Sequence, residues 1–234
     1  MEHSANVVPL EHSMVDEATE VLMSAFQKEA LTTALLLDLS QKRHRGLYSK
    51  TVKLELDLYL RTEQPVFVAV EDGKVIGIAI IKTPHAKGNL LLSARIILPY
   101  LSRLIFLAPT LVRAIRLAPV IKKPKGLPKP HYIIEAVAVD PKHQGKKVGR
   151  LLLEHSHSYC MSDKDSRGIH ITTGDEKNRN IYERFGYQML EQRRTGDFTS
   201  YHMFLENNIS ECISGSAGIP GISGRRTWFQ LRLL

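Results

Sequence analysis

The segment 132–161 constrains the fold of this chain more than any other part of the sequence. It opens with eight strand-forming residues, Tyr132–Val139 (YIIEAVAV), and continues through a lysine-rich loop at 140–147 into a helical pattern at 148–161. A strand that passes through a short loop into a helix is a building unit of α/β domains. The first turn of such a helix presents unpaired N–H groups and a positive dipole end, which bind anions. The segment therefore predicts an α/β protein with a polyanion site at the start of this helix.

Further helices and strands are predicted on both sides of this unit. Apolar residues at helical spacing predict helices at 14–30, about 31–46 and about 48–62. Two apolar runs at 66–70 and 75–81 predict a β-hairpin, because the Asp72-Gly73 pair between them accepts the positive φ angles of a tight turn. The later pattern predicts a strand at 169–173, a short helix at 178–185, and strands near 187–193 and 199–205.

Basic residues are concentrated in one segment, 86–130. The whole chain has a formal net charge of +8, but this segment contains nine Lys and Arg residues and no Asp or Glu, so the rest of the chain has a net charge of −1. Proline recurs every ten residues, at Pro99, Pro109 and Pro119. Because proline is tolerated in the first turn of a helix, this spacing predicts two short helices at about 99–107 and 109–118, followed by a linker at 122–130.

Several roles are excluded by composition and spacing. The uncharged gaps in the basic segment reach nine residues, whereas a membrane span needs about 20. Its two aromatic residues, Tyr100 and Phe106, are too few to stack on a nucleic acid strand, and no zinc or helix-turn-helix pattern accompanies them. The N-terminal residues lack the pattern of a signal peptide, so a cytoplasmic protein is expected. Two cysteines and scattered histidines form neither a disulfide framework nor a metal-ligand pattern.

Two motifs occur in a fixed order along the chain. Residues 144–149 read Gln-Gly-Lys-Lys-Val-Gly after a strand that ends Val139-Asp140-Pro141, and residues 178–187 read Asn-Arg-Asn-Ile-Tyr-Glu-Arg-Phe-Gly-Tyr. Together they resemble the Q/R-x-x-G-x-G/A and Asn…Y-E-x-x-G-F motifs of the GNAT superfamily of N-acetyltransferases. The resemblance covers about residues 5–206. It implies a mixed, mostly antiparallel central sheet flanked by helices, with the helical insertion between the third and fourth strands.

The resemblance also implies a site for acetyl-CoA as co-substrate, with no metal. The backbone of Val137, Ala138 and Val139 is expected to pair with the pantetheine arm, and an N–H there is expected to polarise the thioester carbonyl. Asn178 is expected to contact the same arm. The amides expected to hold the pyrophosphate belong to Gln144, Gly145, Lys146, Lys147, Val148, Gly149 and Arg150. Lys147 departs from the family pattern, which has glycine there, and either weakens cofactor affinity or substitutes a charge for close backbone approach.

Two catalytic roles follow from the resemblance and from residue chemistry. Tyr182 lies four residues after Asn178, hence on the same helix face, and its hydroxyl is expected to protonate the departing thiolate. A base must deprotonate the acceptor amine. Glu135, an acid in an otherwise apolar strand, is the first candidate, because burial raises the pKa of a carboxyl group towards neutrality. An outward-facing or ion-paired carboxylate is the alternative for Glu135, and His131, acting through a water, is the second candidate base.

The sequence therefore predicts an N-acetyltransferase domain at 1–206 with its helical basic insertion at 86–130, followed by a disordered tail at 207–234. The acetyl group is expected to pass from acetyl-CoA to a small-molecule or protein amine by direct attack in a ternary complex. The insertion is interpreted as a lid over the acceptor site, in preference to membrane-surface contact through 95–118. The alternative function is that of a non-catalytic acyl-CoA-binding or membrane-peripheral protein with a degenerate site.

Overall fold

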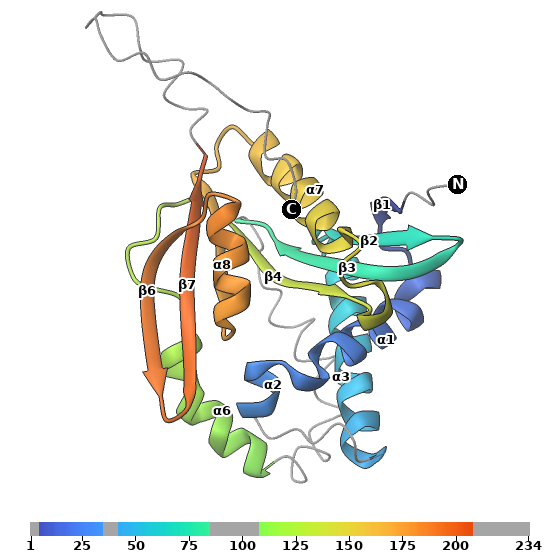
Figure 1. Ribbon diagram of the computed structural model, residues 1–234, viewed down its shortest axis with the longest axis horizontal. Coiled ribbons are helices and arrows are strands. Elements are labelled where there is room, and N and C mark those ends of the chain that lie inside the picture. The colour runs from blue at the N-terminus through green and yellow to red at the C-terminus, as the bar shows by residue number, and fades with distance from the viewer. Residues whose placement is uncertain (1–4, 35–41, 85–107, 208–234) are drawn as a thin grey trace, which may run out of the picture.

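The computed structural model describes residues 5–34, 42–84 and 108–207. In this part of the chain seven strands form one sheet: β1 (Asn6–Pro9), β2 (Val66–Glu71), β3 (Lys74–Lys82), β4 (Tyr132–Val139), β5 (Gly168–Thr173), β6 (Gln188–Thr195) and β7 (Phe198–Glu206). The strand order is β1-β2-β3-β4-β5-β7-β6, and neighbouring strands are antiparallel except for the parallel pair β4 and β5 (Figure 1). The predicted mixed, mostly antiparallel sheet is confirmed.

The predicted hairpin is present, and it has an outer neighbour, β1, that was not predicted. Asp72 and Gly73 have φ angles of 50° and 74°, as the two central residues of a tight hairpin turn between β2 and β3 require. β1 pairs with β2 along the outer edge of the sheet. No strand was predicted at Asn6–Pro9, because four residues are too short for a periodic pattern to emerge.

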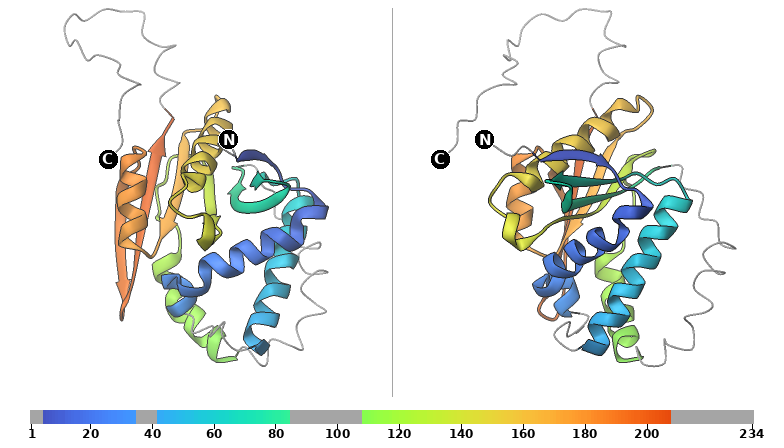
Figure 2. Two further views of the ribbon diagram at one scale, coloured as in Figure 1. Left: turned by 45° about the vertical axis from the view of Figure 1, so that its right-hand side comes forward. Right: turned by 90° about the vertical axis from the view of Figure 1, so that its right-hand side faces the viewer.

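Helices cover both faces of the sheet. The described helices are α1 (Val15–Ala25), α2 (Ala30–Ala34), α3 (Lys42–Arg61), α6 (Ala108–Ile121), α7 (Val148–Ser162) and α8 (Glu176–Arg184). α1 and α3 pack on one face through a core that includes Leu22, Leu56 and Ile78, and α7 packs on the opposite face through Leu152 and Leu153 (Figure 2). α8 joins α7 on its face, because Tyr182 and Phe185 pack against the same core cluster as Leu153.

The helix boundaries differ from the predicted ones in the first quarter of the chain. The predicted helix 14–30 divides into α1, a 3-10 turn at Phe26–Lys28 and the start of α2. The predicted break at residue 47 is wrong, since α3 continues through it from Lys42 to Arg61. This helix is held by tertiary packing of Val52, Leu56 and Tyr59 rather than by local signals.

The basic insertion enters the chain between β3 and β4, as the resemblance implied. Its described helix, α6, covers the predicted helix 109–118 and ends at Ile121, with Pro119 in its last turn. The predicted helix 99–107 lies outside the described residues. α6 is anchored to β7, because the Val120 carbonyl accepts a hydrogen bond from Ser200 Oγ (2.6 Å) and lies 2.8 Å from His202 Nε2. The side chains of Leu117 and Val120 pack on Phe198 of the same strand.

The described chain ends just after β7, close to the predicted domain boundary. Asn207 is still attached to the domain: its N–H donates to the Arg167 carbonyl (3.0 Å) and its side-chain amide donates to the Asp163 carbonyl (3.2 Å). The remainder of the predicted tail, 208–234, lies outside the described residues.

Candidate active site

The sheet opens at its centre, between the two parallel strands. β4 and β5 are paired only at Tyr132–Ile169, Ile133–His170 and Ile134–Ile171. The second half of β4 keeps its other partner, since Val137, Ala138 and Val139 remain in register with β3. The edge of these three residues that faces β5 therefore carries backbone groups outside the ladder. An extended ligand can pair with such an edge as an added strand.

A β-bulge marks the point where the strands part. In the β3–β4 ladder Ile80 pairs with Ala136 and Ile81 pairs with Ile134, so Glu135 is the extra residue on β4. The bulge shifts the alternation of side chains. Ile134 belongs to the core on the α7 face, whereas Ala136 and Ala138 pack into the core on the α1 and α3 face. The sequence predicted neither the bulge nor this switch of faces.

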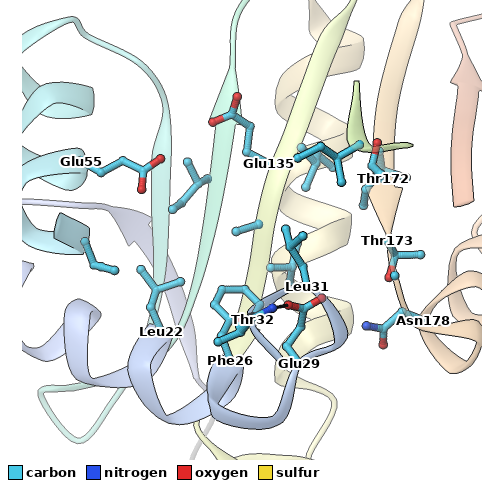
Figure 3. A pocket seen from close by; sticks show the side chains of 18 of the residues that line it. Leu22, Phe26, Glu29, Leu31, Thr32, Glu55, Glu135, Thr172, Thr173 and Asn178 are labelled. Carbon is cyan, nitrogen blue, oxygen red and sulfur yellow. Dashed lines mark hydrogen bonds between the residues drawn. The ribbon is translucent and has the colours of Figure 1, made fainter. Parts of the chain in front are cut away.

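A cavity of about 420 Å³ lies at this gap and is lined by residues from both faces of the sheet. Leu22, Phe26 and Glu55 reach it from α1, the adjoining 3-10 turn and α3, while Asn178 and Tyr182 reach it from α8 on the opposite face. Figure 3 shows the Glu55 and Glu135 side chains at one end and Glu29 with Asn178 at the other. The volume is in the range of small-molecule sites. The structure thus brings Glu135, Val137, Asn178 and Tyr182 together, although they are distant in sequence.

Glu135 has the electrostatic setting of a base that works near neutral pH. Burial, followed by the nearby Glu55 carboxylate, raises the pKa of Glu135 to about 7. Its Oε1 lies 3.9 Å from Lys82 Nζ, and its side chain is 30% exposed. The pKa of Glu55 is also raised by burial, while Lys82 opposes that shift. Both carboxyl groups therefore stay protonated to a higher pH than an unperturbed carboxyl group does.

Tyr182 has the setting of a proton donor. It lies on α8 one turn after Asn178, and both side chains line the cavity. Burial, followed by the charges of Asp175 and Glu29, raises the pKa of Tyr182 to about 12, above the ordinary value that the sequence analysis assumed. The phenol is therefore protonated at any physiological pH. Packing against the core cluster that contains Tyr187 fixes its ring.

The loop that follows β4 is shaped to present backbone N–H groups. The first intrahelical bond of α7 runs from the Leu151 N–H to the Lys147 carbonyl (3.0 Å), so the amides of Val148, Gly149 and Arg150 precede it and have no intrahelical acceptor. Gly145 has a φ angle of 82° and Lys147 a φ angle of 64°. Lys147 thus adopts the left-handed conformation that favours glycine, at the position where the family pattern has glycine. Lys147 therefore holds a backbone conformation that is costly for a residue other than glycine.

The remaining candidates are placed less centrally. His131 is outside the cavity lining, and its Nδ1 lies 2.6 Å from the Pro128 carbonyl, which accepts the ring N–H. The insertion contributes one described residue to the cavity wall, Ile121. Within residues 5–34, 42–84 and 108–207, no cluster of His, Cys, Asp or Glu is placed to hold a metal ion. None of the helices in these same ranges is long and apolar enough to cross a membrane.

Several polar residues of the cavity were not singled out by the sequence, among them four on the α2 and α3 side. Glu29 caps α2 by accepting hydrogen bonds from the Thr32 N–H (2.9 Å) and hydroxyl (3.4 Å). Tyr48 is hydrogen-bonded to Thr32, and Glu55 lies on the cavity side of α3. Each belongs to an ordinary helical pattern in the sequence, and only the packing of α2 and α3 over the gap gives these residues a shared role.

Comparisons with known proteins identify the family and the fold. Residues 29–187 match the sequence model of the family described as Acetyltransferase (GNAT) family. A solved structure described as histone acetyltransferase HPA2 and related acetyltransferase from Corynebacterium glutamicum superposes with a TM-score of 0.56 at 18% identity, covering 86% of this chain and 95% of the other.

Two further solved structures share the fold. The ribosomal-protein-S18-alanine N-acetyltransferase from Escherichia coli has a TM-score of 0.52 at 14% identity, covering 97% of this chain and all of the other. The C-terminal condensation domain of Ebony, in complex with β-alanyl-dopamine, has a TM-score of 0.58 at 14% identity, covering 87% of this chain and 99% of the other. At these identities the likeness shows the fold, and the family match rests on the sequence.

Proposed function

Because the chain belongs to the GNAT family of acetyltransferases, we propose that it transfers the acetyl group of acetyl-CoA to a primary amine by direct attack in a ternary complex. The observation that carries the proposal is the cavity at the β4–β5 gap, which holds Glu135 from one side and Asn178 with Tyr182 from the other. An acceptor on the α1 and α3 face and an acyl donor on the α7 and α8 face meet at this gap without a covalent enzyme intermediate.

The donor side binds through backbone groups and a few cations. The free edge of Val137–Val139 pairs with the pantetheine arm, and an N–H of this edge stabilises the developing oxyanion. The amides at the start of α7 hold the pyrophosphate, as helix N-termini commonly do. Asn178 positions the arm. Lys147 adds a positive charge beside the pyrophosphate instead of disrupting the loop, because its backbone already has the conformation of glycine.

Proton transfers complete the reaction. Glu135 takes one proton from the acceptor ammonium, which leaves a neutral amine whose lone pair attacks the thioester carbon. The C–N bond forms, the C–S bond breaks, and the second nitrogen proton is lost as the amide forms. Tyr182 donates its hydroxyl proton to the departing thiolate and is reprotonated from solvent. The balance is one amide, one free thiol and one proton released for each ammonium consumed.

Initial-velocity kinetics with acetyl-CoA and a panel of primary amines test the proposal. Intersecting double-reciprocal plots and an N-acetylated product identified by mass spectrometry are expected. Parallel plots indicate an acetyl-enzyme intermediate and contradict direct attack. If calorimetry shows CoA binding while no amine in the panel is acetylated, the non-catalytic alternative is supported instead. Loss of CoA binding altogether contradicts both functions.

A further inference from the structure

The charged residues that line the cavity in the described part of the chain are all acidic. Among the described residues that line it are Glu29, Glu55 and Glu135, while no Lys, Arg or His of the described chain belongs to the lining. Glu29 is already engaged in capping α2 through Thr32. Glu55 and Glu135 do not cap a helix, and they come from different elements, α3 and β4.

These two glutamates share one end of the cavity. In Figure 3 the Glu55 side chain extends from α3 towards the sheet, and the Glu135 carboxyl group extends from β4 towards α3. The two carboxylates repel each other, as the effect of Glu55 on Glu135 shows. Lys82, 3.9 Å from Glu135 and 44% exposed, offsets part of this negative charge from outside the lining. A cation that enters between the two carboxylates relieves their repulsion.

Apart from Thr32 and the Tyr48 hydroxyl, the rest of the acceptor side is apolar in the described part of the chain. It is lined by Leu22, Phe26, Leu31, Tyr48, Val52, Leu56, Ile80, Ile121 and Phe198. The Tyr48 hydroxyl is occupied by its hydrogen bond to Thr32. Among the described residues that line the cavity, a carboxylate on the acceptor would meet three glutamates and no cation, and it would be repelled.

From this arrangement we infer that Glu55 and Glu135 form an ammonium-binding subsite, and that the acceptor is an alkyl- or arylalkylamine without a carboxylate. The inference rests on the proposed acetyltransferase function and adds the substrate class to it. Glu55 contacts the ammonium and holds it beside Glu135, whereas the apolar wall takes the uncharged body of the acceptor.

Matched acceptors test the substrate class. With phenethylamine, phenylalaninamide and phenylalanine, kcat/KM is expected to be similar within about tenfold for the first two and about a hundredfold lower for the carboxylate-bearing third. Equal or faster acetylation of phenylalanine overturns the inference while leaving the acetyltransferase function intact. Absence of turnover with every amine contradicts the proposed function itself.

A substitution at Glu55 tests the subsite. Glu55→Gln is expected to raise KM for phenethylamine by about tenfold or more, because it removes a charge-assisted hydrogen bond, while the Kd of CoA stays unchanged. The matched control is Asp57→Asn on the same helix, whose carboxylate is paired with Arg61 (2.6 Å) instead of facing the cavity. An unchanged KM in folded Glu55→Gln, or an equal rise in Asp57→Asn, overturns the assignment.

Discussion

Lys82 Nζ lies 3.9 Å from Glu135 Oε1, so the candidate base has a cation beside it as well as the like charge of Glu55. The ion pair favours the ionised carboxylate, whereas burial and Glu55 favour the protonated acid. Burial and then Glu55 raise the pKa of Glu135 to about 7.

This balance predicts the pH dependence of acetyl transfer. Glu135 must be ionised to accept a proton, so kcat/KM is expected to rise with pH through a midpoint of about 7. Lys82→Met is expected to move this limb to higher pH, because it removes the favourable charge, and Glu55→Gln to lower pH, because it removes the repulsive one. Shifts in the same direction for both variants would contradict this account. Glu135→Gln is expected to abolish the limb.

Loss of the Tyr182 hydroxyl is expected to slow the chemical step. Tyr182→Phe keeps the ring that packs in the core cluster, so the fold and the Kd of CoA are expected to be unchanged while kcat falls by about 10²–10⁴. Tyr159→Phe, on the exposed side of α7, is the control for removal of a phenol elsewhere. A wild-type kcat in Tyr182→Phe would exclude Tyr182 as the proton donor.

The left-handed backbone at Lys147 gives a prediction about stability. Lys147 has a φ angle of 64°, which glycine adopts at a lower cost. Lys147→Gly is therefore expected to raise the free energy of unfolding by about 0.5–1 kcal/mol, measured by urea denaturation. Lys147→Ala keeps the cost of this conformation and removes the charge, so it separates the two effects on CoA affinity. If the free energy of unfolding of Lys147→Gly is not higher than that of Lys147→Ala, the conformational explanation is wrong.

A buried histidine predicts loss of stability in acid. His170 is 1% exposed, neither ring nitrogen has a hydrogen-bond partner within the described structure, and it faces His202, His131 and Lys123. Burial, followed by these positive neighbours, lowers the pKa of His170 to about 3. Below about pH 6.5 the unfolded chain therefore binds a proton at His170 that the folded chain does not bind. The free energy of unfolding consequently decreases as the pH is lowered.

The expected loss from His170 between pH 7.5 and 5 is about 2 kcal/mol. The measurement is urea denaturation at both pH values for the wild type and for His170→Leu, in which the loss is expected to shrink by this amount. An identical pH dependence in the two proteins would assign the acid sensitivity to other groups.

Sequence patterns predicted those parts of the site that are local in the chain. The strand Tyr132–Val139, the loop and α7 form one continuous segment whose pattern is strong, and Asn178 and Tyr182 share a helix face by spacing alone. The bulge at Glu135 depends on the register of β3, which no local pattern encodes. Glu55 faces the cavity because of how α3 packs on the sheet, so a single amphipathic helix gave no sign of it.

The partial pairing of β4 with β5 has a mechanical consequence. Three residue pairs between β4 and β5 join the two halves of the sheet, β1 to β4 and β5 to β7. The proposed pantetheine arm lies in the gap where β4 and β5 are unpaired. Acetyl-CoA bound across this gap would act as an added strand and connect the two halves of the sheet. Heat resistance is therefore expected to rise with acetyl-CoA concentration, since a ligand that binds only the folded chain stabilises it by mass action. In this fold the acyl donor is expected both to react and to hold the two halves of the sheet together.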